Sequence, residues 1–193
     1  VYWWVYEPTQ VHQQLASSVN FAIGRTVTQM RVNLPLSQVV LDNTKQIETC
    51  AFRVGTDEQS WLDVNNRAFS DHPEQGGWTK EILQSRQQEP WFSPNGFLLH
   101  HVDNKLAGFC WTKLHPETQP VLGEIYVIAV EPDFAGRGLG RSLTVAGLQH
   151  LAKLGTTVGM LYVDNQNSIA LNMYTDLGFT SHHQQCAFVG DVH

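Results

Sequence analysis

A glycine-rich turn between an apolar run and a long apolar-periodic segment constrains this chain more than any other feature. Residues 122–130 read L-G-E-I-Y-V-I-A-V, an apolar and β-branched run that predicts a buried strand. Pro132 ends that strand, because proline has no N–H to give to a ladder. The turn G-R-G-L-G-R follows over residues 136–141 and opens a predicted helix over residues 138–154. The first N–H groups of a helix lack partners and its dipole adds positive potential, so we expect phosphate to bind here.

The glycine spacing separates this turn from two common phosphate-binding motifs. A P-loop requires Lys and then Ser or Thr after its last glycine, whereas Arg141 and Ser142 follow Gly140 here. A dinucleotide-binding fingerprint requires G-x-G-x-x-G near the start of a βαβ unit, with an acidic residue about 20 positions later. Neither pattern fits this sequence.

The turn instead resembles the pyrophosphate-binding motif of the GCN5-related N-acetyltransferases, which is R-G-x-G after E-P. A second motif agrees with the first. Residues 162–179 carry Y-V-D-x-x-N-x-x-A-x-x-x-Y-x-x-L-G-F, similar to the next strand, helix and closing segment of that family. The sequence departs from the family at Ala135, where Gln or Arg is usual; this removes a side chain but none of the backbone N–H donors.

Composition excludes several other classes of protein. The formal net charge of −6 argues against a general affinity for nucleic acid, so an anionic cofactor must be held by local groups such as Arg137, Arg141 and backbone N–H donors. The sequence shows no signal peptide and no apolar run of the roughly 20 residues that a membrane span requires. Three scattered cysteines do not form a disulfide framework, which favours a reducing cytoplasm.

Metal and thiol chemistry are not expected. His100 and His101 are neighbours on a predicted strand and face opposite ways, and His182-His183 has no spaced partner that suggests zinc. Cys110 lies in an apolar strand without a visible base, and we interpret it as a buried structural thiol. We interpret Trp78, Trp91 and Trp111 as core or pocket wall.

The two ends of the chain carry the same order of elements. Residues 1–34 predict a strand, a helix with Val11, Leu15 and Val19 on one side, and a second strand, as residues 159–189 do. We therefore predict that residues 1–34 are the end of a preceding domain of the same type; an unrelated hairpin and helix is the alternative. Residues 35–46 are predicted to be a linker and residues 47–193 the acetyltransferase domain.

The elements predicted in the main domain match the family's fold. A strand over 47–54 precedes a helix capped by Thr56-Asp57, and Thr79 caps a second helix that ends near residue 88. The remaining predicted elements are strands over 97–102, 106–114 and 122–130, the helix over 138–154, a strand over 159–163, a helix over 168–177 and a strand over 183–189. This order matches the α/β (α+β) fold of the GCN5-related N-acetyltransferases, a mixed central sheet flanked by helices.

Further segments resemble the mycothiol synthase branch of this family, whose members occur in actinobacteria. The resemblance covers nearly all of residues 47–189 and includes the loop H-P-E-Q-G-G-W-T over 72–79 and G-F-C-W-T-K-L-H over 108–115. It implies acetyl transfer from acetyl-CoA to the cysteinyl amine of desacetylmycothiol, which gives mycothiol and CoA. It also implies two tandem acetyltransferase domains in the full-length protein, with residues 1–34 as the end of the first.

The resemblance and the chemistry together give two candidate catalytic residues. Glu124 lies on the strand beside the expected acetyl site and is the candidate general base for the acceptor amine. Tyr174 lies where the family often places the acid that protonates the leaving thiolate. The structural alternatives are an exposed strand carboxylate for Glu124 and a half-buried aromatic that packs beside Leu171 and Leu177 for Tyr174.

The binding residues implied by the resemblance fall into three groups. The backbone of Ile128, Ala129 and Val130 is expected to pair with the pantetheine arm like an added strand. The pyrophosphate and the other side of acetyl-CoA are expected to lie on Ala135, Gly136, Arg137, Gly138, Leu139, Gly140 and Arg141, and on Asn167, Ser168, Ile169, Ala170, Leu171 and Asn172. Glu74, Lys113, Glu124 and Tyr162 are the candidate contacts to the sugar–inositol and cysteinyl parts. For Asn167 a simple helix cap is the alternative, and Glu74, Lys113 and Tyr162 have the alternative of ordinary polar residues.

Two other functions remain open from the sequence. The same fold could acetylate a protein N-terminus or another small amine. It could also be a non-catalytic module that binds acetyl-CoA.

Overall fold

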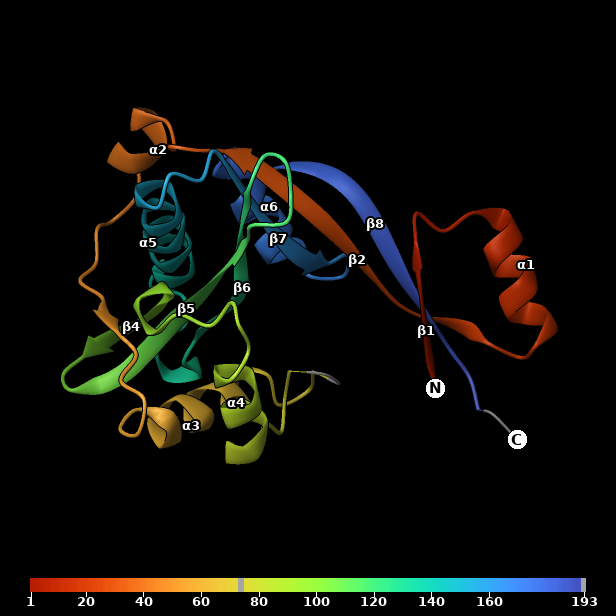
Figure 1. Ribbon diagram of the computed structural model, residues 1–193, viewed down its shortest axis with the longest axis horizontal. Helices are drawn as coiled ribbons and strands as arrows, with labels where there is room; N and C mark the ends of the chain where they lie inside the picture. The colour runs from red at the N-terminus through yellow and green to blue at the C-terminus, as the bar shows by residue number, and fades with distance from the viewer. Residues whose placement is uncertain (73–74, 192–193) are drawn as a thin grey trace. The chain divides into compact units, whose positions relative to one another are not determined.

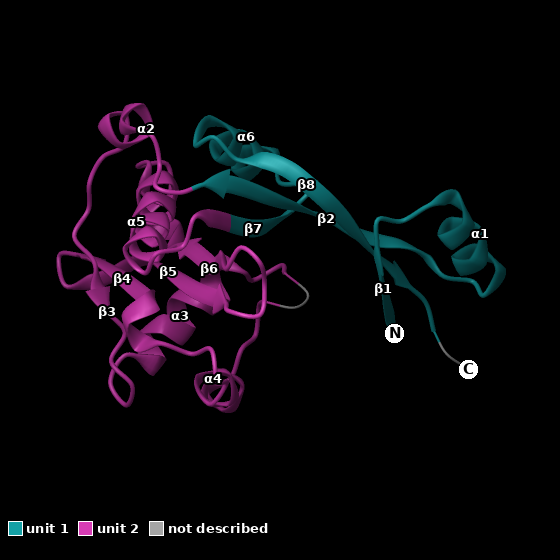
Figure 2. Cartoon of the chain, turned by 45° about the horizontal axis from the view of Figure 1, so that its top comes forward, with its two compact units in different colours: residues 1–33, 160–193 teal, residues 34–159 magenta. Residues whose placement is uncertain are grey.

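The computed structural model describes residues 1–72 and 75–191, and the chain divides into two compact units. Unit 1 contains residues 1–33 together with the residues from 160 onward, and unit 2 contains residues 34–159 (Figure 2). The order of elements along the chain is shown in Figure 1.

Unit 2 contains an antiparallel sheet with the strand order β6-β5-β4-β3. Its elements are α2 (Gln38–Asp42), β3 (Cys50–Ala51), α3 (Glu58–Ala68), α4 (Lys80–Gln87), η1 (Pro94–Gly96), β4 (Phe97–Val102), β5 (Lys105–His115), β6 (Leu122–Val130), η2 (Pro132–Phe134) and α5 (Leu139–Lys153). Asp103 and Asn104 form the β4–β5 turn with positive φ values of 50° and 62°, as a two-residue hairpin turn requires.

An aromatic cluster forms the core of unit 2 against α3. The rings of Phe97 and Trp111 stack with their centroids 4.3 Å apart, and Trp61 meets both rings edge-on. Trp78 and Trp111 are buried and Trp91 packs against the same cluster, which confirms their interpretation as core or wall. Aromatic pairs in these geometries stabilise a core beyond the area they bury.

Helix α5 approaches the sheet closely because of a glycine. A Cβ built at Gly147 would overlap Cys110 of β5 and Ile125 of β6, so only glycine lets the helix backbone come this near to both strands. This contact holds the middle of α5 against β5 and β6, and the glycine-rich turn lies between β6 and the helix.

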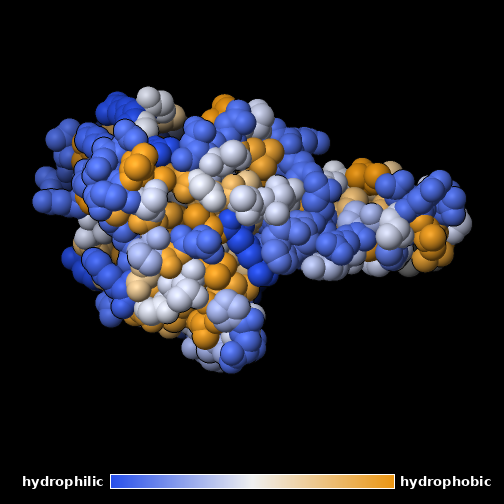
Figure 3. All heavy atoms as spheres, turned by 90° about the horizontal axis from the view of Figure 1, so that it is seen from above, coloured by the Kyte–Doolittle hydropathy of each residue, from blue (hydrophilic) through white to orange (hydrophobic). Residues whose placement is uncertain are grey.

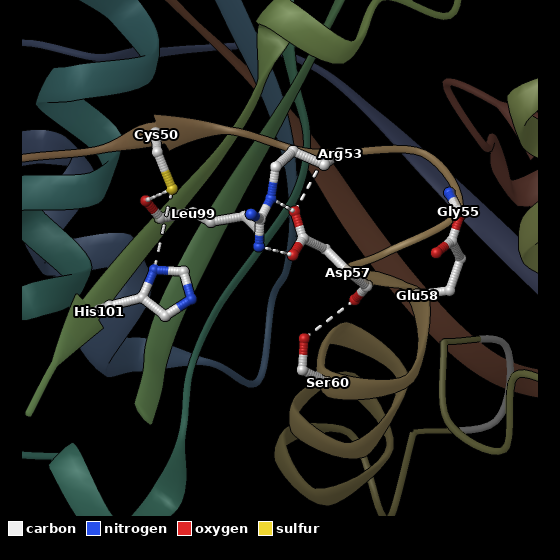
Figure 4. Close-up of polar contacts among 8 residues, drawn as sticks. All are labelled: Cys50, Arg53, Gly55, Asp57, Glu58, Ser60, Leu99 and His101. Atoms are coloured by element: carbon white, nitrogen blue, oxygen red, sulfur yellow. Dashed lines mark hydrogen bonds and ion pairs between the residues drawn. The ribbon is translucent and has the colours of Figure 1, made fainter. Parts of the chain in front are cut away.

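The first strand of unit 2 is shorter than the sequence predicts. Only Cys50 and Ala51 of the predicted strand over residues 47–54 are in β3, and beyond it the Arg53 N–H bonds the Asp57 carboxylate at 2.7 Å. Asp57 does occupy the N-cap position of α3, but its side chain makes no capping bond there. It turns back to Arg53 and binds the guanidinium at 2.7 Å, as Figure 4 shows. Thr79, in contrast, caps α4 as predicted.

The Arg53–Asp57 pair predicts a stability that falls in acid. The hydrogen bond from Arg53 lowers the pKa of the Asp57 carboxyl below its value of 3.8 in an unfolded chain. A lowered folded pKa stabilises the protein above the unfolded value, and this contribution is lost as the pH falls from about 4 through the folded pKa. Asp57→Asn should therefore lower the melting temperature by a few degrees at pH 7 and by much less near pH 3.

Thermal unfolding at a series of pH values tests this prediction. Asp63→Asn is the matched control, because Asp63 is an exposed residue of the same helix that accepts a hydrogen bond from Gln59. A melting-temperature loss for Asp57→Asn that is the same at pH 3 and pH 7 would contradict the ionic origin of the effect.

Unit 1 is built from two similar β-α-β segments that exchange strands. The first consists of β1 (Tyr2–Tyr6), α1 (Gln10–Ser18) and β2 (Ala22–Asn33); the second consists of β7 (Val158–Asp164), α6 (Ser168–Asp176) and β8 (Thr180–Val189). The strand order is β1-β8-β2-β7, so β8 pairs with both strands of the first segment and β2 lies between both strands of the second. Val158 and Gly159, the first residues of β7, are assigned to unit 2.

Because the two β-α-β segments exchange strands, the boundaries of the compact units differ from those of the domains predicted from the sequence. Residues 1–33 pack with residues from 160 onward, although the sequence groups the latter with residues 47–159. The assignment of residues 1–34 to a preceding domain stays a prediction, and the predicted linker over residues 35–46 contains the short helix α2.

Helix α1 does not bury its expected apolar side among the described residues. Val11, Leu15 and Val19 are exposed, and Ala16 is the buried residue of the helix, packed near Val5 and Phe188. Apolar atoms are accordingly visible on the surface of this part of unit 1 in Figure 3.

Strand exchange predicts that a chain lacking residues 1–33 loses the structure of β8. Both neighbours of β8 in the sheet come from those residues, so its N–H and C=O groups would have no ladder. Hydrogen exchange should show β8 unprotected while β4, β5 and α5 stay protected. Addition of a synthetic peptide of residues 1–33 should restore protection of β8. Full protection of β8 without the peptide would contradict the prediction.

Candidate acetyl-CoA site

The strand β6 passes into helix α5 through a short turn with two left-handed glycines. Gly136 and Gly138 have φ values of 74° and 75°, and no atom lies within 4 Å of a Cβ built at either position. Gly138 is the N-cap of α5. Glycine adopts this backbone conformation without the steric cost that other residues carry, so the turn leaves an open surface at the helix N-terminus.

The backbone N–H groups of this turn are available to an anion. Ser142 is the first residue of the helix whose N–H bonds a carbonyl, that of Gly138 at 3.2 Å. In the described part of the chain, the N–H groups of residues 136–141 have no protein acceptor. A row of unpaired donors at a helix N-terminus is the arrangement that binds phosphate, as the sequence predicts.

The two arginines of the turn lie differently. The Arg137 side chain is on the surface, lies over the Phe134 ring at 5.0 Å and donates to the Asp133 carbonyl. Arg141 donates through Nε to the Thr44 hydroxyl at 3.0 Å, next to the bond from Ser142 to the Lys45 carbonyl at 2.7 Å. The segment after α2 thereby fastens the first turn of α5.

The three residues expected to pair with the pantetheine arm end β6. Ile128, Ala129 and Val130 face Cys110, Phe109 and Gly108 of β5 in the antiparallel register. Ala129 is buried and the other two are half-buried. Their role toward the cofactor stays a prediction.

Glu124 lies on the same strand with a partner that sequence reasoning missed. It is 8% exposed, and its Oε2 is 2.7 Å from His115 Nε2 at the end of β5. The other ring nitrogen of His115, Nδ1, is 3.1 Å from Glu117 Oε1. The G-F-C-W-T-K-L-H segment ends at His115, but strand register is needed to bring it to Glu124.

Lys113 and Glu124 are direct neighbours across the β5–β6 ladder. The Lys113 ammonium lies 4.7 Å from the Trp91 ring centre and 5.7 Å from that of Tyr126. A cation is attracted to aromatic faces, so the Lys113 ammonium is stabilised against Trp91 and Tyr126.

Carboxylates set the titration of His115. The hydrogen bond to Glu124 is the main cause that raises its pKa; partial burial lowers it, Glu117 raises it and Lys113 lowers it. Because the folded pKa is raised, the stabilising contribution of the protonated ring is complete below about pH 6.5 and is lost as the pH rises through the folded pKa. Burial also raises the pKa of Tyr126.

Unit 1 holds the other predicted residues. Asn167 is the N-cap of α6 and accepts from the Ala170 N–H at 3.1 Å, so the capping role is confirmed. Ser168 begins the helix, Ala170 and Leu171 are half-buried, and Ile169 and Asn172 are exposed. Tyr174 is 6% exposed, and its ring lies 5.6 Å from that of Phe179.

The two remaining candidates differ in what the structure describes. Tyr162 on β7 is 41% exposed, and its hydroxyl accepts a hydrogen bond from Gln29 at 2.7 Å. Glu74 lies outside the described residues.

Two further expectations from the sequence concern metal ions and thiols. Among residues 1–72 and 75–191 no group of three or more His, Cys, Asp or Glu residues is placed to hold a metal ion. Cys110 is fully buried and burial raises the pKa of its thiol, which confirms a structural thiol. No helix in the described ranges has the length and apolar character of a membrane span.

Comparison with known proteins identifies the fold and the family. The model of the "Acetyltransferase (GNAT) family" matches residues 58–179, well over half of the chain. The chain belongs to this family. The GNAT fold and its use of acetyl-CoA therefore agree with the unpaired N–H groups at the beginning of α5.

Curated relatives with a more specific name than the family have higher sequence identity to this chain. The chain is 49% identical over 169 residues to a mycothiol acetyltransferase of Thermomonospora curvata, with 86% of this chain and 55% of the relative covered. It is 43% identical to a mycothiol acetyltransferase of Acidimicrobium ferrooxidans over 98% of this chain and 62% of the relative. The chain thus spans somewhat more than half of the length of these relatives.

Solved structures share the fold at low sequence identity. A GCN5-related N-acetyltransferase of Sphaerobacter thermophilus has a TM-score of 0.75 at 20% identity and covers 97% of this chain and 58% of its own. A tandem GNAT protein from the clavulanic acid biosynthesis pathway has a TM-score of 0.68 at 14% identity, with 97% and 62% covered.

The open turn predicts a selective effect of a methyl group on cofactor affinity. Gly138→Ala should weaken acetyl-CoA binding at least about tenfold, because the left-handed backbone is strained by a Cβ and the N–H groups lose their alignment. Gly155→Ala is the matched control: Gly155 follows the other end of α5 with a φ of 84° and the same open space. Both variants should lose similar thermal stability, about 1 kcal/mol. Calorimetric titration that shows equal affinity loss in both variants would contradict the assignment.

Proposed function

We propose that this chain transfers acetyl from acetyl-CoA to the cysteinyl amine of desacetylmycothiol and so forms mycothiol and CoA. The observation that carries the proposal is the nearly buried carboxylate of Glu124 on β6, the strand that leads directly into the open turn before α5. Relatives named mycothiol acetyltransferase, at 41–49% identity, support this choice of acceptor.

The turn and its flanking elements account for cofactor binding in this proposal. The N–H groups of residues 136–141 take the pyrophosphate, because they have no protein acceptor among the described residues. The backbone of residues 128–130 pairs with the pantetheine arm, and the beginning of α6 from Asn167 to Asn172 lines its other side.

The acceptor nitrogen loses two protons in this reaction and the leaving thiolate gains one. Glu124 takes the first proton from the acceptor ammonium, and the free amine nitrogen then attacks the thioester carbonyl carbon. A backbone N–H at the end of β6 polarises that carbonyl. The C–S bond breaks, and the Tyr174 hydroxyl gives its proton to the leaving CoA thiolate. The attacking nitrogen loses its second proton as the amide forms, and this proton returns through solvent to the Tyr174 phenolate.

Polar residues are proposed to provide contacts for a hydroxyl-rich acceptor. Lys113 is the neighbour of Glu124 across the β5–β6 ladder, and Tyr162 has a hydroxyl on β7. Glu74 completes the proposed set from its position in the sequence. A polyhydroxylated ligand needs such paired donors and acceptors to replace its lost water.

A preceding domain is part of the proposal for the full-length protein. The β1-α1-β2 segment repeats the order β7-α6-β8, and the two mycothiol acetyltransferases compared above are longer than this chain. We propose that residues 1–34 close an acetyltransferase-like domain that precedes unit 2.

Replacement of Glu124 tests the catalytic assignment. Glu124→Gln should reduce kcat with desacetylmycothiol about 100-fold or more, because an amide cannot accept the amine proton, while acetyl-CoA affinity stays within a few-fold. Glu48→Gln, at an exposed carboxylate of unit 2, is the control and should retain full turnover. Equal turnover in Glu124→Gln would remove this residue from the mechanism.

The acceptor is tested by competition among amines. Desacetylmycothiol, peptides with free N-termini and simple amines are offered with acetyl-CoA, and CoA release and acetylated product are measured. Preference for a peptide or a simple amine would keep the fold and replace the acceptor. Acetyl-CoA binding without transfer to any amine would indicate a binding module.

A further inference from the structure

His115 bridges two carboxylates that differ sharply in exposure. Nε2 contacts Glu124 at 2.7 Å and Nδ1 contacts Glu117 at 3.1 Å. The side chains of His115 and Glu124 are 16% and 10% exposed, whereas that of Glu117 is 68% exposed. The three groups therefore connect the candidate base to the surface through one ring.

The turn that carries Glu117 is fixed by local hydrogen bonds. The Thr118 hydroxyl donates toward the carbonyl oxygens of His115 and Pro120 at 2.8 and 2.9 Å, and it accepts from the Leu122 N–H at 3.0 Å. The side chain of Thr118 thus closes the connection between β5 and β6. Glu117 is held beside the His115 ring by the path of the backbone rather than by chance contact on the surface.

This geometry determines the protonation of the ring. A carboxylate oxygen can only accept, so contacts at both ring nitrogens require an N–H on each, which only the imidazolium has. The charged groups that face the ring are Glu124 on β6, Glu117 in the turn and Lys113 on β5. Two carboxylates against one ammonium favour the cationic ring.

The contact of His115 with both Glu124 and Glu117, here called the bridge, also makes the two oxygens of Glu124 different. In the part of the chain that the structure describes, the hydrogen bond of Glu124 uses Oε2, and Oε1 has no protein partner. Glu117 holds the His115 ring, and the ring in turn holds Oε2 of Glu124. The Glu124 carboxylate is therefore fixed, and its Oε1 points in one direction.

We infer that His115 is a positioning residue that, as an imidazolium bridged to Glu117, holds Oε2 of Glu124 and leaves Oε1 to take the proton of the acceptor amine. This inference rests on the proposed function, because it takes Glu124 as the base. It assigns a purpose to Glu117, which otherwise is an exposed acid in a surface turn.

Titration of the ring tests the bridge without any turnover. The His115 resonances are followed by NMR in protein with ¹⁵N-labelled histidine, and His115→Gln identifies them by their disappearance. Glu124→Gln should lower the pKa of His115 the most, Glu117→Gln should lower it less and Lys113→Met should raise it. An unchanged pKa of His115 in both glutamine variants would overturn the bridge.

The pH dependence of kcat tests the positioning role. Wild-type kcat should fall as the pH rises through the pKa of His115, since the neutral ring releases one carboxylate. Glu117→Gln should move this fall to lower pH, and His115→Gln should abolish it. His115→Gln, which retains an N–H donor for Glu124, should keep about tenfold more kcat than His115→Leu, with KM for acetyl-CoA within twofold in both.

A residue with a merely structural role gives a different result. His115→Gln and His115→Leu would then lose stability and kcat together, and Glu117→Gln would leave the position of the pH limb unchanged, which would refute the inference. His100→Gln is the matched control: His100 is a half-buried histidine of β4 that bonds the Glu48 carbonyl, and its replacement should leave the profile unchanged.

Failure of the proposed function is recognised separately. If desacetylmycothiol is not acetylated but another amine is, the acceptor is wrong and the same profiles are measured with that amine. If no amine is acetylated, the proposed function and the catalytic purpose of the bridge are both refuted, and the NMR titration alone decides whether the bridge exists.

Discussion

The structure depends on the beginning of helix α5, where backbone donors have no acceptor among the described residues. These donors are the N–H groups from Gly136 to Arg141, and unpaired donors of this kind are costly unless water or a ligand takes them. Arg141 and Ser142 donate hydrogen bonds to Thr44 and Lys45 and so hold that end of the helix, and the close approach at Gly147 holds its middle against the sheet. An acidic chain can hold an anion here because the donors are main-chain groups whose field is local.

Much of this part of the molecule follows from local sequence. The glycines at 136 and 138 predict the left-handed turn, Pro132 predicts the end of β6, and Thr79 and Asn167 predict helix caps, because each of these signals acts within a few residues. The absence of a larger residue at Ala135 leaves this backbone arrangement intact, as expected for a site made of N–H groups. The roles of Tyr174, Tyr162, Lys113 and residues 128–130 stay predictions.

Sequence analysis missed features of two kinds. Some depend on contacts between residues that are distant along the chain, and others on which of several possible partners a side chain binds. His115 reaches Glu124 only through the antiparallel register of β5 and β6, which periodicity does not reveal. Asp57 has the residue type and position of a helix cap, yet its carboxylate instead accepts hydrogen bonds from the Arg53 guanidinium and backbone N–H. The apolar pattern of α1 correctly predicts a helix, but no described residues cover its apolar side.

The exchange of β2 and β8 has a consequence for synthesis in the cell. Arg31 on β2 contacts Thr180 on β8 across 149 positions of chain, and every neighbour of β1 and β2 in the sheet belongs to the later segment. A ribosome that adds about 5–20 residues per second leaves these early strands waiting on the order of ten seconds for their partners. During that interval the backbone N–H and C=O groups of β1 and β2 have no strand partner, so both strands are open to pairing with other nascent chains.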